Sequence, residues 1–443
     1  MGRPLPCCVE GPDTFLPKAR YALDTLLTGL SLEPLWTDRE GLGDGGLYYG
    51  PEPGAVPATA LRFRLAPETA AYFAARTPYD PHQIGSLSWN GTCWPLMFLF
   101  GADGGGAEDG VLEVDPIASA FYWLAGWDEH TTTARDAHGR FPYEASLHAR
   151  LGTIRDPLVD VYRGWLGDTL QQRGVPVERR LWAGKAWAVA LTHDVDFVRT
   201  WRLRTLVNDP RQLLLDGFVD AAEARGASST FFLKAGATAR EDVPYRLASP
   251  DLLRLLGRLQ EGGFEVGFHP SYFAHDHPGH LRKEHDRLAA ALGAPPTTVR
   301  QHYLRWTAPT TPRLQAAAGL ALDSTLGFAA REGFRRATAC PFRLFDLDAN
   351  APLDLWELPL SVMDTTLFAH RGLQVDEAEA QVEAVFAACR RVGGCAVLLW
   401  HNEPYTPHHD ALLGRLLDRA LNDGALVAGL KNALSVWEER LPA

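Results

Sequence analysis

Chemically capable side chains recur in the second half of the chain, each time directly after a short apolar segment. The groups are Asp194 with Asp196, His269 with Tyr272, Arg300 with His302 and Tyr303, Asp323 with Ser324, and His401 with Asn402. Carboxylates and imidazoles serve as general bases, general acids and metal ligands, and a guanidinium pairs with a carboxylate. Five such groups after five apolar segments are difficult to explain by packing alone. We therefore predict that they meet in one active site.

The spacing of Asp194 and Asp196 places both carboxylates on one face of an extended strand. Side chains alternate along a strand, so His193 points to the opposite face, and the same parity puts Arg300 and His302 together. Two neighbouring carboxylates repel each other unless a cation or an arginine neutralises them. Carboxylate and imidazole groups are ligands that zinc and related metals accept. A divalent metal ion, with zinc as our expectation, is the predicted cofactor.

Strand-like and helix-like segments alternate from about residue 186 to the C-terminus. Apolar runs typical of buried parallel strands cover residues 187–191, 229–233, 264–268, 297–299, 321–322, 356–360 and 396–399. Helical patterns cover residues 210–225, 250–261, 280–292 and 376–391. This alternation predicts an α/β fold, a distorted (β/α) barrel of about seven parallel strands over residues 186–443. In such barrels the active site lies at the C-terminal ends of the strands, which is where the polar groups stand.

The first 180 residues follow a different pattern, with no clear period beyond a helical pattern at residues 19–30. We expect residues 1–180 to form a smaller α+β domain of unknown function. The polar stretch 171–180 is the predicted connection to the barrel, because strand–helix alternation begins just after it.

Composition excludes several classes of protein. The formal net charge is -11 and no run of five basic residues occurs, so a nucleic-acid partner is not expected. The longest apolar run, residues 94–100, is far shorter than the roughly 20 residues of a membrane span. The N-terminal sequence lacks the apolar stretch of a signal peptide, so we expect a cytoplasmic protein. Six irregularly spaced cysteines indicate free thiols instead of a disulfide framework.

Four of the strand-end sequences carry a family resemblance. They are Asp194-Val195-Asp196, Gly267-Phe268-His269-Pro270, Arg300-Gln301-His302-Tyr303 and Leu398-Leu399-Trp400-His401. In this order they resemble the first, second, third and fifth motifs of the polysaccharide deacetylase family, carbohydrate esterase family 4. Asp323-Ser324-Thr325 falls near the start of that family's fourth motif. The resemblance covers about residues 188–403, and the N-terminal half resembles the uncharacterised domain that precedes this barrel in some bacterial homologues.

The resemblance implies a role for each matching residue. Asp194 matches the base that deprotonates the water attacking an acetyl group. Asp196 would bind the metal, His269 would be the first histidine ligand, and Arg300 would orient the base. His401 would protonate the leaving amine. These are the parts that amide hydrolysis requires: an activated water, a stabilised oxyanion and an acid for the nitrogen.

Two departures from the family pattern concern the metal site. Val195 separates two aspartates that are usually adjacent, and Phe273 stands where a second histidine usually follows the first by four residues. Catalytic metal sites commonly use three protein ligands, which leaves His275 and His302 as candidates for the third. We predict His302, because a strand end is rigid whereas His275 lies in a segment that reads as a mobile loop.

Several other residues are assigned from their position in the pattern. Tyr272, Tyr303 and Trp400 lie near the same rim, where aromatic faces can stack on sugar rings, so they are the predicted substrate-binding residues. Residues 127–130 and 136–138 contain histidines and acids without a strand-end context, and we expect them at the surface. His408 and His409 are expected to form an exposed helix start.

The function predicted from these observations is a metal-dependent hydrolase that removes an acetyl group from an N-acetylated sugar or saccharide precursor. Two alternatives stay open. One is a catalytically weak carbohydrate-binding or assembly protein that keeps the barrel but has lost the metal through the altered second motif. The other is a hydrolase that applies the same chemistry to a non-sugar amide.

Overall fold

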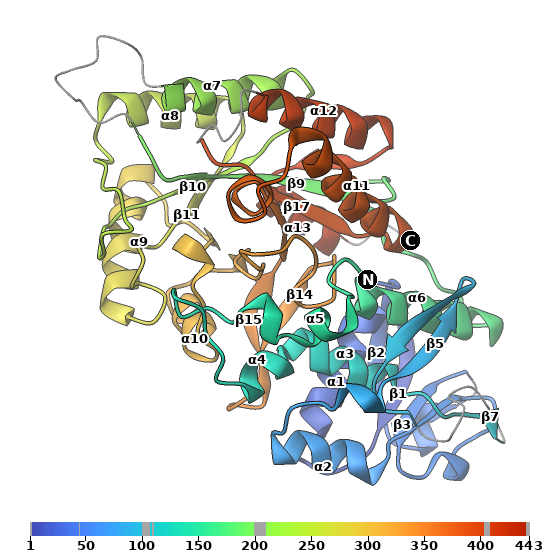
Figure 1. Ribbon diagram of the computed structural model, residues 1–443. Helices are drawn as coiled ribbons and strands as arrows, with labels where there is room; N and C mark the ends of the chain where they lie inside the picture. The colour runs from blue at the N-terminus through green and yellow to red at the C-terminus, as the bar shows by residue number, and fades with distance from the viewer. Residues whose placement is uncertain are drawn as a thin grey trace.

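The computed structural model describes residues 2–43, 45–99, 107–108, 110–198, 210–402 and 408–439. Figure 1 shows a smaller N-terminal region beside a larger region in which strands lie inside and helices outside. The fold is mixed α/β, with a curled sheet of parallel strands and a smaller additional region, as the sequence predicts. Among the residues that the structure describes, no helix is long and apolar enough to cross a membrane.

A six-stranded sheet forms the centre of the N-terminal region, in the order β2-β1-β3-β4-β8-β7. All its pairings are parallel except β7 with β8. The strands are β1 (Arg3–Val9), β2 (Leu32–Trp36), β3 (Leu47–Gly50), β4 (Leu61–Arg64), β7 (Ala107–Glu108) and β8 (Val111–Leu112), with a separate hairpin of β5 (Gly85–Trp89) and β6 (Thr92–Leu96). The helices are α1 (Leu16–Thr28), α2 (Pro67–Ala75), α3 (Pro116–Ala125), α4 (Trp127–Thr131), α5 (Leu147–Leu151) and α6 (Leu158–Gln172).

The larger region alternates strands and helices along the chain. Its strands are β9 (Ala188–Val195), β10 (Thr230–Leu233), β11 (Glu265–Phe268), β12 (Thr298–Val299), β13 (Leu322–Asp323), β14 (Phe342–Asp346), β15 (Ala351–Glu357), β16 (Leu360–Met363), β17 (Cys395–Leu399) and β18 (Leu426–Ala428). Its helices are α7 (Pro210–Glu223), α8 (Pro250–Glu261), α9 (Pro278–Leu292), α10 (Thr310–Ala317), α11 (Val375–Val392), α12 (His409–Asn422) and α13 (Leu430–Glu438). A π-helical turn covers Thr366–His370.

Seven parallel strands close into a distorted barrel. Neighbours run in the order β15-β13-β12-β11-β10-β9-β17-β16. Because β15 and β16 are two halves of one extended segment, residues 351–363, this segment pairs with β13 through its first half and with β17 through its second. The predicted parallel direction of the strands is confirmed. β14 adds an antiparallel edge to β15, and β18 pairs with the first half of β9.

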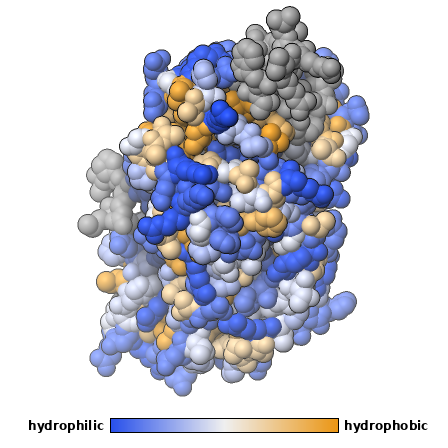
Figure 2. Space-filling view, turned by 90° about the vertical axis from the view of Figure 1, so that its left-hand side faces the viewer, coloured by the Kyte–Doolittle hydropathy of each residue, from blue (hydrophilic) through white to orange (hydrophobic). Residues whose placement is uncertain are grey.

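The outer helices bury one apolar stripe against the barrel. In α8 the buried residues are Leu252, Leu255, Leu256 and Leu259, which follow the spacing of one helix face. The side chains on the opposite faces meet solvent. The face in Figure 2 is accordingly mainly hydrophilic, with hydrophobic residues in small separate groups.

The N-terminal region packs directly on the barrel. Helix α3 lies against β14 and α1 lies against β15, and buried side chains of both regions belong to one continuous hydrophobic core. Within this contact, the carboxylate of Glu129 pairs with Arg335 at 2.8 Å and with Arg336 at 3.1 Å. All three side chains are at most 5% exposed, so the contact places charge inside the molecule.

Candidate active site

The candidate site lies at the C-terminal ends of β9, β11, β12 and β17. Asp194 is the second-last residue of β9, and Asp196 follows directly after the strand. His193, between the apolar residues of β9 and Asp194, faces the other way and stacks on Phe218 of α7 with ring centroids 4.3 Å apart. The alternation along β9 therefore sends the two carboxylates inward and the imidazole to the helix layer.

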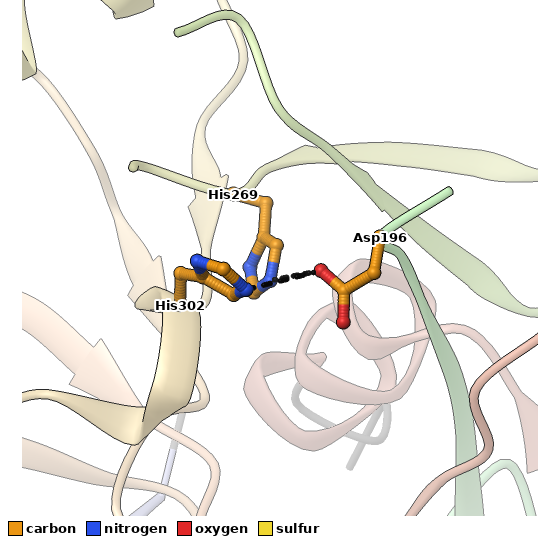
Figure 3. A group of neighbouring side chains, drawn as sticks. All are labelled: Asp196, His269 and His302. Carbon is orange, nitrogen blue, oxygen red and sulfur yellow. Dashed lines mark ion pairs between the residues drawn. The ribbon is translucent and has the colours of Figure 1, made fainter. Parts of the chain in front are cut away.

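Asp196, His269 and His302 converge on one point (Figure 3). Asp196 Oδ1 is 3.6 Å from His269 Nε2 and 3.3 Å from His302 Nε2. His269 Nε2 and Asp196 Oδ1 are buried and have no hydrogen-bond partner among the described residues. Leaving such atoms unpaired is costly unless another group completes them. One carboxylate and two imidazoles fit a divalent metal ion such as zinc.

Neighbouring groups fix both imidazoles with Nε2 toward Asp196. His269 Nδ1 lies 2.6 Å from the carbonyl oxygen of Arg300, which can only accept, so Nδ1 carries the proton. His302 Nδ1 lies 2.8 Å from the carboxylate of Asp242, whose pKa is lowered to about 2 against the effect of its burial, mainly by the hydrogen bond from His302. In both cases Nε2 is left to act as a ligand, an arrangement typical of metal-binding histidines.

A lysine that the sequence analysis did not single out also reaches this point. Lys234 follows β10, is 3% exposed, and places Nζ 3.3 Å from Asp196 Oδ1. Burial acts to raise the pKa of Asp196, but the charges of His302 and Lys234 hold it well below its ordinary value. Lys234 stands directly after an apolar run, as the other site residues do, and that position was the signal that could have revealed it.

Arg300 and Asp194 form a buried pair beside the metal-ligand group. Arg300 Nη1 donates to Asp194 Oδ1 at 3.2 Å and to Thr192 Oγ1 at 2.6 Å. Its Nε and Nη2 donate to the carbonyl and hydroxyl oxygens of Ser324 at 2.8 and 2.9 Å. The second carboxylate oxygen of Asp194 lies 3.7 Å from His269 Nε2. Arg300 therefore holds Asp194 in one orientation next to the group of ligands.

His401 faces the same centre from β17. Its Nε2 lies 3.9 Å from Asp196 Oδ2, and its Nδ1 lies 2.6 Å from Asp364 Oδ1. Burial acts to lower the pKa of His401, but the Asp364 carboxylate outweighs it and raises that pKa to about 9. Asp364 follows β16 and also accepts from the His401 backbone N–H at 2.7 Å. Sequence reasoning missed Asp364, although it stands directly after the last residue of β16, as other site residues stand after their strands.

Two predicted positions differ in the structure. Trp400, predicted to stack on substrate, is fully buried, and its indole N–H donates to His409 Nδ1 at 3.2 Å. Trp400 belongs to the core. Side chains alternate along an extended segment, so Trp400 points away from the site that the next residue, His401, faces. His409, predicted to be an exposed helix start, is 1% exposed and lies 3.1 Å from Asp364 Oδ2.

The remaining candidates occupy the rim. Tyr303 is 38% exposed and offers a face to solvent, whereas Tyr272 is 7% exposed and packs edge-on against it at 5.5 Å. His275 is buried, with Nε2 3.4 Å from Asp276, and does not join the group around Asp196. Phe273, at the position of the missing histidine, is 44% exposed.

Residues 127–130 and 136–138 were expected at the surface. Residues 136–138 do lie there, partly or fully exposed, whereas the first group is partly buried. Trp127 and Glu129 are buried in the contact between the two regions. His138 Nδ1 lies 3.0 Å from the hydroxyl of Tyr272, at the rim of the barrel. Contacts between regions distant in sequence leave no local pattern, so the burial of Trp127 and Glu129 could not be predicted.

Taken together, the geometry can hold a divalent cation, keep a carboxylate beside it and present a protonated imidazole from the other side. A hollow of about 750 Å³ lies elsewhere, lined by α1 and by the first residues of β15. It contains none of the site residues, so its size has no bearing on this chemistry.

Comparisons with known proteins give a family match for part of the N-terminal region and structural likeness for the barrel. Residues 67–175 match a family of unknown function, DUF7033. Several solved structures similar to this chain are described as polysaccharide deacetylases, family 4 carbohydrate esterases or family 4 pseudoenzymes. A protein of Mycobacterium smegmatis described as a polysaccharide deacetylase is 22% identical, with 57% of this chain and 91% of that chain covered and a TM-score of 0.43.

Two further structures show the range of these relatives. The family 4 carbohydrate esterase of Streptomyces lividans is 16% identical, with 55% of this chain and 92% of that chain covered and a TM-score of 0.32. A family 4 pseudoenzyme of Bacillus anthracis is 14% identical, with 56% and 65% covered and a TM-score of 0.33. The comparison with curated proteins found no match.

Proposed function

We propose that this protein is a metal-dependent hydrolase that removes an acetyl group from an N-acetylated sugar or saccharide precursor. The observation that carries the proposal is the convergence of three parts at one mouth of the barrel. A carboxylate and two imidazoles form a ligand group, Asp194 is held beside it by Arg300, and His401 faces it from β17. The order of the motifs that contain these residues supports the same reaction.

Asp196, His269 and His302 are the proposed metal ligands. A divalent ion bound to them, for which zinc is our expectation, supplies Lewis-acid polarisation of the scissile carbonyl. The Arg300 and Asp242 groups behind the imidazoles keep both Nε2 atoms aimed at the ion.

Asp194 is the proposed general base and His401 the proposed general acid. Asp194 is not one of the proposed metal ligands, but its carboxylate lies 3.7 Å from His269 Nε2. It can therefore take a proton from a water that attacks the amide. His401, held protonated by Asp364, can give a proton to the leaving nitrogen. The two groups approach the centre from different strands, β9 and β17, as proton removal and proton delivery on opposite sides of a carbonyl require.

A second candidate function is favoured by Lys234. Its ammonium group contacts the same oxygen of Asp196 that faces the two histidines, and it supplies one positive charge without any metal. In that case the barrel would bind acetylated saccharide and hydrolyse it poorly or not at all.

Metal content and acetate release separate the two functions. We expect purified protein, incubated with zinc and dialysed, to hold about one equivalent of metal and to release acetate from a panel of N-acetylated sugars that includes both free precursors and polymers. Protein that binds saccharide but holds no metal and releases no acetate would establish the second function. Release of acetate from simple acetylated amides alone would shift the substrate away from sugars.

A further inference from the structure

A loop of the N-terminal region lies on the rim of the candidate active site. His138 places Nδ1 3.0 Å from the Tyr272 hydroxyl, and its ring centroid is 4.8 Å from that of Tyr303. Arg305 Nε donates to the carbonyl oxygen of His138 at 2.9 Å. Tyr303 in turn is the neighbour of His302, with ring centroids 4.8 Å apart. The loop is therefore separated from a proposed metal ligand by one side chain.

The loop is held in one conformation by its own hydrogen bonds. Asp136 accepts from the backbone N–H groups of His138 and Arg140, both at 2.9 Å, and from Arg140 Nε at 2.7 Å. Arg140 Nη1 then donates to the carbonyl oxygen of Tyr303 at 2.8 Å. Tyr303 has a φ of +60°, a conformation uncommon for a residue with a side chain, so this contact fixes a strained turn directly after His302.

Next to this loop, a hollow of about 210 Å³ opens between the two regions. The N-terminal region contributes Arg140, Phe141 and Tyr143 to its lining, and the barrel contributes Phe328 and His370. The ring of Phe328 lies 6.1 Å from that of Phe141 and 5.7 Å from that of Tyr143. Sites for whole drug-sized ligands measure about 300–1,000 Å³, so this hollow suits one ring of a longer molecule.

Both walls of the hollow connect to the site. On one side, Arg140 reaches the residue after His302. On the other, His370 ends the π-helical turn that begins two residues after Asp364, the partner of His401. The hollow is thus attached to the segment with a proposed metal ligand and to the segment that orients the proposed acid.

We propose that residues 136–143, together with Phe328 and His370, form a binding subsite for a second sugar ring of the substrate, so that the substrate is at least a disaccharide. The proposal rests on the proposed function. The aromatic rings suit the apolar faces of a sugar ring, and the imidazole of His370, the phenol of Tyr143 and the guanidinium of Arg140 suit its hydroxyl groups. This assigns a substrate-recognition role to a segment inside the matched family of unknown function.

Binding of two defined sugars to the full-length chain tests the subsite. The probes are N-acetylglucosamine and its β-1,4-linked N,N′-diacetyl disaccharide, titrated calorimetrically in an Asp194→Asn background so that the ligand is not consumed. We expect Tyr143→Ala to weaken disaccharide binding by about three- to tenfold and to leave monosaccharide binding unchanged. Tyr143→Phe should keep most of the affinity, because the ring remains.

Trp36→Ala is the matched control, since Trp36 is a 38% exposed aromatic residue of β2 outside the hollow. Three results would overturn the subsite. The parent protein could bind both sugars with equal affinity, Tyr143→Ala could weaken the binding of both sugars equally, or neither sugar could bind. A separate measurement of acetate release by the chain with native Asp194 distinguishes failure of the subsite from failure of the proposed function. Release from the monosaccharide without preference for the disaccharide would rule out the subsite but not the hydrolase.

Discussion

Asp196, His269 and His302 could be predicted because each stands at the end of an apolar strand, and parallel strands bring such ends to one edge. The groups that complete their environment carried weaker signals. Lys234 is a single lysine after β10, and Asp242 lies in a loop nine residues after that strand. Loop residues reach a site through tertiary contacts, which no local period records. The central ligands were therefore predictable, and their supporting partners were not.

The choice between His302 and His275 leads to a prediction about metal binding. His302→Ala removes an imidazole 3.3 Å from Asp196, whereas His275 lies outside the ligand group. We expect His302→Ala to lower zinc occupancy strongly and His275→Ala to leave it near the level of the unaltered protein. Elemental analysis after dialysis measures both. Equal or reversed losses would remove His302 from the ligand set.

His401 leads to a prediction about pH dependence. The Asp364 carboxylate raises the pKa of His401 to about 9, so the acid keeps its proton up to that pH and activity should fall above it. Asp364→Asn removes the raising charge, so the falling limb of the pH profile should move to lower pH. If the pH at which activity falls is the same in Asp364→Asn as in the unaltered protein, another group delivers the proton.

His401→Ala should lower the rate of hydrolysis by about 10²- to 10⁴-fold with metal retained.

At the level of elements, the barrel strands were predictable and the N-terminal sheet was not. Buried parallel strands give continuous apolar runs, which is the pattern of β9 and β17. β1 contains Pro4 and Pro6, which argue against an inner strand because proline lacks an N–H donor. The strand tolerates them because β3 pairs only with residues 7–9, leaving that side of residues 4 and 6 without a partner strand.

The buried contact between α4 and the barrel predicts a large effect on stability. Glu129→Ala leaves Arg335 and Arg336 inside the molecule without their carboxylate, which typically costs about 3–5 kcal/mol. Glu379→Ala is the control, because its partner Arg415 is 46% exposed and such surface pairs contribute about 1 kcal/mol or less. Urea unfolding gives both values. A loss of stability in Glu129→Ala no greater than that of the control would mean that the buried pair does not stabilise the contact.

At the scale of the whole molecule, we propose that residues 1–180 and 186–443 are two domains. α6 ends at Gln172, and residues 173–181 form neither helix nor strand. Trypsin should therefore cut first within residues 171–184, after Arg173, Arg179 or Arg180, and gel analysis with mass spectrometry identifies the fragments. First cleavage inside the barrel, for instance at Arg258 near Gly263, would contradict this boundary.

In the proposed hydrolytic centre, Asp194 acts beside the metal without binding it. The most direct test is acetate release from N-acetylated saccharides by zinc-loaded protein and by Asp194→Asn, with zinc content measured on the same samples. We predict that Asp194→Asn lowers acetate release by about 10²- to 10⁴-fold while its zinc content and folding stay nearly unchanged. Loss of zinc from Asp194→Asn would reverse the roles of Asp194 and Asp196, and absence of acetate release from fully zinc-loaded parent protein across the panel would contradict the proposed function itself.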